Sequence, residues 1–74
     1  MSPHTVPLPG KELLRRLLKL GFELLRVKRS HHFVAHEDGR RTTIPIHVND
    51  NPPLGIYKQI LRDVEINDSE IKRK

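Results

Sequence analysis

Leucine residues recur with helical spacing near the start of the chain. Between Lys11 and Leu20 they occupy positions i, i+1, i+4 and i+5, and most of the basic residues fall on the other side of the same stretch. That period is typical of an amphipathic helix, which buries its apolar stripe. Gly21 follows directly, at the position where many helices end in a left-handed residue. The pattern therefore predicts a helix over residues 11–20, with a stripe formed by Leu13, Leu14, Leu17 and Leu18.

The pattern then changes to that of short strands. Residues 22–28 and 30–36 are too short and too irregular for helices, and residues 41–47 alternate between two faces. Asp38-Gly39 predicts a hairpin turn, because glycine accepts the positive φ that a tight turn needs. Pro45 has no backbone donor, so we expect it at an edge or where pairing ends. One face of the third predicted strand is formed by Thr42, Ile44 and Ile46.

A second apolar stripe predicts a second helix from Leu54 onward. Ile56, Ile60 and Val64 are spaced by four residues, which is the spacing of one helix face. Asn67, with a glutamate three residues later, is a capping pattern that predicts a last short turn. The stretch over residues 49–53 is predicted as a loop because it combines prolines with Asn and Asp. Beside the stripe of the second helix lie Tyr57 and Leu61.

The order of these elements defines the expected architecture. We expect a proline-containing arm over residues 1–9, a single domain over residues 10–71 and a basic tail over residues 72–74. Three strands grouped between helices predict an α+β fold, with helices on one face of the sheet and the other face free. On a basic domain, a free sheet face is a place where a ligand can bind.

Charge and cysteine content narrow the classes of partner and chemistry. Lys and Arg number 14 against 9 Asp and Glu, a formal net charge of +5, which favours nucleic acid, an anionic membrane surface or an acidic protein. Cysteine is absent from the sequence, which excludes disulfides, thiolate zinc sites and a cysteine nucleophile. No apolar run approaches the roughly 20 residues of a membrane span, and the start of the chain does not resemble a signal peptide. We therefore expect a cytoplasmic protein without a membrane interaction.

The histidines are the most unusual feature of the composition. His32 and His36 would share one strand face but lie about 13 Å apart, which is too far for one zinc ion. The carboxylates are scattered, so we expect no metal centre and no cofactor. A histidine acting on RNA remains, because an imidazole can accept or donate a proton near neutral pH while neighbouring cations hold phosphate. A non-catalytic RNA-binding module and a protein-interaction domain are the alternatives.

Four segments, taken together and in order, resemble the HicA-type toxins of toxin–antitoxin pairs. The family pattern combines a Gly-Phe pair and a basic Ser-His-His segment, a Pro-x-His strand end and a helix with Ile-Leu-Arg-Asp. The matching segments are Gly21-Phe22 with Val27-Lys28-Arg29-Ser30-His31-His32, then His36-Glu37-Asp38-Gly39-Arg40, then Ile44-Pro45-Ile46-His47, and finally Leu54-Gly55 with Lys58-Gln59-Ile60-Leu61-Arg62-Asp63. The resemblance extends from Gly10 to about Ile71.

The resemblance implies a fold, an activity and a partner. The fold is that of a double-stranded-RNA-binding domain, α-β-β-β-α with a three-stranded antiparallel sheet. The activity is that of an mRNA interferase, a metal-independent endoribonuclease that cleaves single-stranded RNA and arrests translation, with His31 as the catalytic residue. The partner is a HicB-type antitoxin that covers the basic face and His31. Contacts to RNA are expected from Lys28, Arg29, Ser30, His32, Arg40, Arg41 and His47.

The sequence departs from the family pattern at two glycines. Arg29 stands before the motif serine, so the turn there either binds RNA differently or gains a phosphate contact, and a toxin inactivated by Arg29 is a further alternative. Glu65 replaces a glycine late in the second helix, where it is expected to lengthen that helix. The basic residues of the two helices are either a solvated surface or a stripe that follows an RNA groove; they are Arg15, Arg16, Lys19, Lys58 and Arg62.

Overall fold

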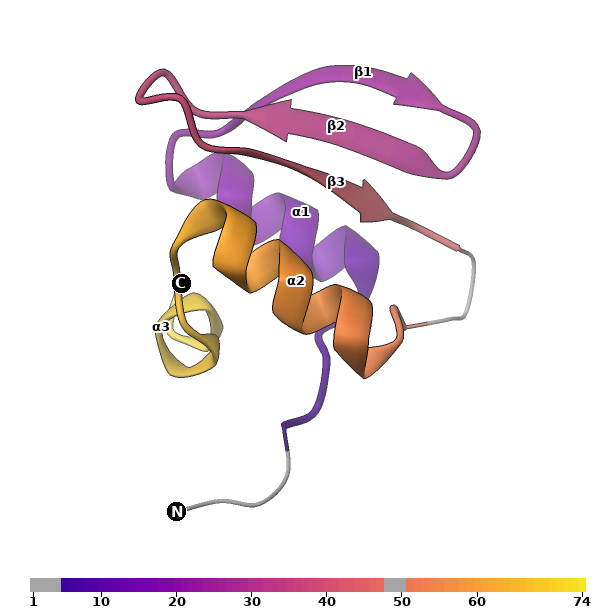
Figure 1. Cartoon of the computed structure of the whole chain (residues 1–74), viewed down its shortest axis with the longest axis vertical. Helices are drawn as coiled ribbons and strands as arrows, with labels where there is room; N and C mark the ends of the chain where they lie inside the picture. The colour runs from indigo at the N-terminus through magenta and orange to yellow at the C-terminus, as the bar shows by residue number, and fades with distance from the viewer. Residues whose placement is uncertain (1–4, 48–50) are drawn as a thin grey trace.

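The structure is a computed structural model that describes residues 5–47 and 51–74. Helices and strands follow one another in the predicted order, so the α+β fold class is confirmed (Figure 1). Residues 1–4 of the predicted arm and residues 49–50 of the predicted loop before the second helix lie outside the described residues. The elements are α1 (Gly10–Lys19), β1 (Glu23–Lys28), β2 (His31–Ala35), β3 (Arg41–Pro45), α2 (Leu54–Val64) and α3 (Asp68–Lys72).

The three strands form one antiparallel sheet in the order β1-β2-β3. Paired residues of neighbouring strands share a sheet face, so the register divides the side chains into two sets. Val34, Thr42 and Ile44 lie on one face and are buried, which makes it the core face. We call the opposite side the free face; its residues are Glu23, Arg26, Lys28, His31, Phe33, Ala35, Arg41, Thr43 and Pro45.

Strand β1 is the most exposed element of the sheet. The helices lie beside β3, and β1 is the strand farthest from them (Figure 1). All six residues of β1 are exposed, including Leu25 at 63%. A bulge between Leu24 and Arg26 inserts Leu25 as an extra residue opposite β2. Arg26, opposite Phe33, lies on the free face, and the extra residue bends β1 and increases its local twist.

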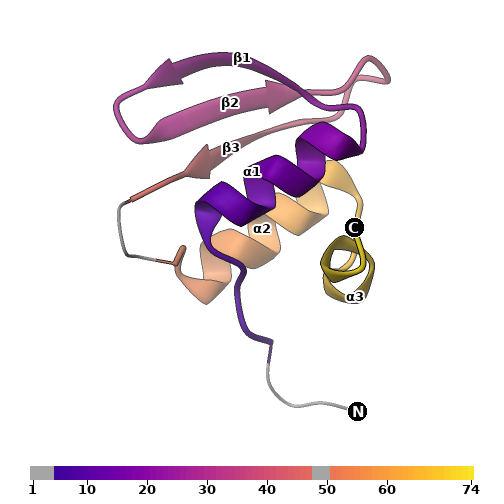
Figure 2. The same cartoon turned by 180° about the vertical axis from the view of Figure 1, so that it is seen from behind.

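The core lies between the two long helices and the core face of the sheet, and seen from behind α1 lies in front of α2 (Figure 2). Leu13 and Leu17 of α1 are fully buried, whereas Leu14 is half-buried and Leu18 is 42% exposed. In α2 the predicted stripe is wrong at Ile56, which is 43% exposed, whereas Ile60 and Val64 of the same stripe are buried. The core residues are Leu13, Leu17, Phe22, Val34, Ile44, Tyr57, Ile60, Leu61, Val64, Ile66 and Ile71.

The helix ends are set by backbone conformation. Gly21 has φ +100°, and the N–H of Phe22 donates to the carbonyl of Leu17 over 3.1 Å, which closes α1 as predicted. Helix α2 ends at Val64, because Glu65 adopts the left-handed conformation with φ +58°. The expectation that Glu65 lengthens this helix is therefore wrong. Gly21 and Glu65 thus both occupy positions where the chain leaves a helix through positive φ.

The last turn of the chain is fastened to α1. Asn67 caps α3 by accepting a hydrogen bond from the N–H of Glu70 over 2.7 Å, as the capping pattern predicted. Ile71 of α3 is fully buried in the core. The guanidinium of Arg16 donates to the carbonyls of Ile71 and Lys72 over 3.1 and 2.7 Å. Helix α3 is thus held both by apolar packing and by a cation at its carbonyl end.

Candidate nucleic-acid interface

A two-residue turn positions the candidate catalytic histidine. Arg29 and Ser30 connect β1 to β2, and Arg29 has φ +58°. The carbonyl of Ser30 accepts a hydrogen bond from the N–H of Ile46 over 2.8 Å, which fastens the turn to the end of β3. Lys28 and His31, on either side of the turn, are direct cross-strand partners. Arg29 therefore occupies a position whose backbone conformation favours glycine, the residue that the family pattern has there.

The two adjacent histidines point to opposite faces. His31 is exposed on the free face, in one row with Lys28 and Pro45. His32 lies on the same side as the buried Val34, and its Nδ1 is 3.1 Å from the carbonyl oxygen of Ser30. Its half-buried ring borders a groove against α1 that is lined by Leu14, Leu18 and Ile46. His31 is therefore the one of this pair that faces an approaching ligand.

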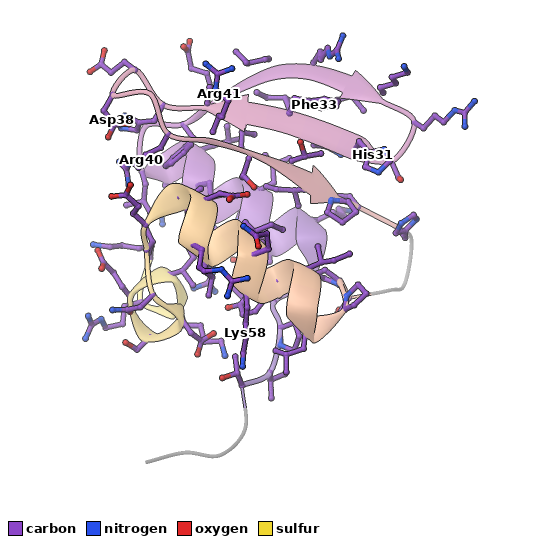
Figure 3. The ribbon with its side chains drawn as sticks, viewed as in Figure 1. His31, Phe33, Asp38, Arg40, Arg41 and Lys58 are labelled. Carbon is purple, nitrogen blue, oxygen red and sulfur yellow. The ribbon has the colours of Figure 1, made fainter. Side chains whose placement is uncertain are left out.

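Cations lie beside His31 on the free face, and Arg41 lies farther along the same face, opposite Ala35 (Figure 3). Arg26 lies in the neighbouring row, and its guanidinium carbon is 4.7 Å from the centre of the Phe33 ring. Among the described residues, no carboxylate forms an ion pair with Arg26, Lys28, Arg29 or Arg41. Phe33 is half-buried. Unpaired cations beside an accessible aromatic ring are the combination that attracts phosphate and stacks bases in proteins that bind single-stranded nucleic acid.

Arg40 lies at the other end of the sheet from His31 (Figure 3). Its guanidinium donates to the carbonyl of Val64 over 2.6 Å and to Asp38 over 2.8 Å, and it stacks over Phe22 at 5.1 Å. The backbone N–H of Arg40 and then its side chain hold the pKa of Asp38 below its usual value. Arg40 thus closes the carbonyl end of α2, and the structure does not bring it together with His31. Arg41 pairs with Ala35 on the free face, and exposed His47 follows Pro45, the partner of His31.

Three basic residues of α1, Arg15, Arg16 and Lys19, are engaged within the chain. Glu12 forms ion pairs with Arg15 and with Arg16. The pKa of the Glu12 carboxyl falls to about 2 because the side chains of Arg15 and then Arg16 donate hydrogen bonds to it. Lys19 donates to the carbonyl of Lys74 over 2.9 Å. These contacts favour the interpretation of α1 as a structural surface, and they leave the free face as the concentration of unpaired positive charge.

A groove that sequence reasoning missed opens between the sheet and α2, and residues of both sheet faces line it. Its volume is about 540 Å³. Residues of all three strands and of α2 line it: Leu25, Phe33, Val34, Arg41, Thr42, Thr43, Ile56, Gln59, Ile60 and Asp63. The only sequence signal for it was an aromatic residue, Phe33, two positions from His31. The sequence pattern assigned Ile56, which also lines the groove, to the apolar stripe of the second helix.

Comparison with known proteins adds one finding. A family model described as the HicA toxin of bacterial toxin–antitoxin systems matches residues 10–66, the segment from the start of α1 to just beyond α2. The comparison with curated proteins finds no match. Within residues 5–47 and 51–74, His, Asp and Glu do not gather in groups of three that could hold a metal ion. None of the described helices is long and apolar enough to cross a membrane.

Proposed function

We propose that this chain, which belongs to the HicA family and is the toxin of a toxin–antitoxin system, is an endoribonuclease. Its proposed substrate is single-stranded mRNA. His31 is the catalytic residue, and no metal takes part. One observation carries the proposal: His31 is exposed on the free face, directly opposite Lys28 and two residues from Phe33. A proton-transfer group thus lies within a surface suited to RNA.

The chemical step uses the substrate's own nucleophile. His31 accepts the proton of a ribose 2′-hydroxyl, and the 2′-oxygen attacks the adjacent phosphorus. The bond from phosphorus to the 5′-oxygen breaks, and that oxygen takes a proton from the solvent or from the protonated imidazole. The products are a 2′,3′-cyclic phosphate and a 5′-hydroxyl. Single-stranded RNA is the expected substrate because in-line attack needs a flexible linkage.

Cations next to His31 hold the phosphate. The ammonium of Lys28 lies in the same row as His31, and Arg29 lies in the turn between them. Positive charge beside the reacting phosphate stabilises the negative charge that develops in the transition state. Arg41 and His47 extend the basic surface along β3 and beyond it, where they contact neighbouring nucleotides. Ser30 and His32 are expected to act by holding the turn.

The antitoxin inhibits by covering this surface. We propose that it is a HicB-type protein whose acidic surface binds the free face and encloses His31. Complementary charge favours fast association between such surfaces. RNA and antitoxin then compete for the same cations, so that the toxin is silent while the antitoxin is bound.

The test is cleavage of a long single-stranded RNA by the purified chain in EDTA. General acid–base catalysis contributes roughly 10²- to 10⁴-fold, so His31→Ala and His31→Gln should lower the rate by at least about a hundredfold while RNA binding persists. His36→Asn is the matched control, since His36 lies at the far end of the sheet against Phe22 and Asp38. Circular dichroism checks that each variant is folded.

Two outcomes contradict the proposal. If wild type binds RNA without cutting it, the chain is an RNA-binding module or a toxin that Arg29 has inactivated, and Arg29→Gly tests the second case. If His31→Ala cuts as fast as wild type, another group performs the proton transfer.

A further inference from the structure

The groove beside α2 differs chemically from the rest of the free face. Apolar side chains form much of its wall, among them Leu25 at 63% and Ile56 at 43% exposure. The carboxylate of Asp63 also lines it, and a carboxylate repels phosphate. The cations of the free face surround this region, but only Arg41 reaches the groove. Its occupant is therefore a neutral group attached to an anionic chain.

The polar groups of the groove are fixed in orientation. The amide nitrogen of Gln59 donates to one oxygen of Asp63 over 2.9 Å, and Thr42 donates to the other oxygen over 2.9 Å. The amide oxygen of Gln59 accepts from Arg62 over 2.8 Å. Side chains held in this way present donors and acceptors without a further loss of rotamer freedom. Such groups suit the hydrogen-bonding edge of a flat, polar-rimmed ligand.

The groove lies close to the candidate catalytic histidine. Phe33, which lines it, is two residues from His31 on the same face of β2, a separation of about 7 Å at strand rise. The guanidinium of Arg26 lies over the Phe33 ring, so this ring is already part of a stacked pair. A chain whose phosphate lies at His31 therefore brings its neighbouring unit to the mouth of the groove.

We propose that this groove binds one unpaired nucleobase of the RNA, next to the linkage held at His31. The base packs against Phe33 and Ile56, its edge faces Gln59 and Thr43, and Arg41 contacts the phosphate at the rim. The groove volume of about 540 Å³ lies within the range of roughly 300–1,000 Å³ that is usual for small-molecule sites. The inference rests on the proposed function only in taking RNA as the ligand. In this proposal, the base bound in the groove determines which linkage of the strand lies at His31.

The test measures binding without cleavage. A fluorescein-labelled single-stranded 2′-O-methyl RNA of mixed sequence has no free 2′-hydroxyl, so it is not cut. A strand of the same length made of abasic residues keeps the phosphates and lacks the bases. Wild type should bind the first strand roughly fivefold to a hundredfold more tightly, which is the effect of stacking one base. This ratio of affinities reports the contribution of the bases and not that of the phosphates, because both strands carry the same charge.

Two variants on α2 locate the base. Ile56→Glu should reduce the ratio to near one, because it places a charge and extra bulk in the groove. Leu54→Glu is the matched control: Leu54 is 40% exposed on the same helix but does not line the groove, so the ratio should stay. Phe33→Leu should lower the ratio and Phe33→Tyr should keep it, and thermal unfolding verifies that these two variants are folded.

The failures are distinguishable. If wild type binds both strands equally, or if Ile56→Glu keeps the ratio, the groove does not hold a base and the inference is wrong, whereas the proposed ribonuclease activity is untouched. If base-dependent binding is present but natural RNA is never cut, the groove assignment holds and the proposed activity fails. If wild type binds neither strand, the groove assignment fails, and the cleavage assay with natural RNA decides the proposed activity on its own.

Discussion

Arg29→Gly tests how much the left-handed turn before His31 costs the fold. Arg29 has φ +58°, a conformation that L-residues other than glycine adopt at a cost of about 1–2 kcal/mol. Glycine removes this cost but gains freedom in the unfolded chain, which offsets about 0.5–1 kcal/mol. The net effect should be a stabilisation of about 0.5–1 kcal/mol, which for a domain of this size raises Tm by about 2–8 °C.

The assay is urea and thermal unfolding followed by circular dichroism, with two comparison variants. Arg29→Ala keeps the backbone strain and removes the charge, so it should not stabilise the chain. Glu65→Gly relieves the same φ of +58° at the end of α2, so its gain should be similar and should add to that of Arg29→Gly. A destabilised Arg29→Gly, or an Arg29→Ala that is equally stabilised, would refute the backbone argument.

Both Arg29 variants should also reduce the salt dependence of single-strand binding by about 0.7 in log–log slope, because one phosphate contact is lost.

Two further predictions concern stability. Leu17→Ala, at a fully buried position, should lower the free energy of unfolding by about 2–5 kcal/mol in urea titrations, whereas Leu18→Ala, at a position 42% exposed, should change it by about 0.5 kcal/mol or less. Equal losses of stability in the two variants would contradict the assignment of Leu17 to the buried side and of Leu18 to the exposed side of α1. The stability of the chain should fall in acid, because the pKa of Glu12 is about 2 in the folded chain and near 4.5 in the unfolded chain. The ionised Glu12 carboxylate therefore contributes its full stabilisation above about pH 5, and this contribution is lost as the pH falls toward 2. In Glu12→Gln that decrease should be smaller; an unchanged pH profile of Tm would contradict the role of the Arg15 and Arg16 contacts.

Periodicity predicted the elements but not how much of each face is covered. Leu13 and Leu18 both belong to the apolar stripe of α1, yet only the first is buried, and Ile56 of α2 is exposed in the same way. The helical period identifies which side of a helix is apolar. The width of the layer that packs against that side depends on the tertiary arrangement, in which both helices approach the sheet beside β3 and leave β1 uncovered.

The candidate site was partly predictable for a similar reason. Strand alternation required His31 and His32 to face opposite ways, and the burial of Val34 decides which one faces the core. The tertiary role of Arg40 had no sequence signal, because its partner, the carbonyl of Val64, is 24 residues away in the chain. The groove brings together residues of β1, β2, β3 and α2, so it exists only once the register and the position of the helix are known.

The exposure of β1 has a consequence for motion. None of its six residues belongs to the core cluster, so detaching this strand from β2 sacrifices hydrogen bonds but little buried apolar area. Segments of this kind open locally at a free energy well below that of global unfolding, and their amide protons exchange first. Arg26 and Lys28 move with β1, whereas Thr43 and Arg41 belong to β3, which is packed against the helices. The basic surface thus has one rigid border and one border that can adjust to the strand it holds.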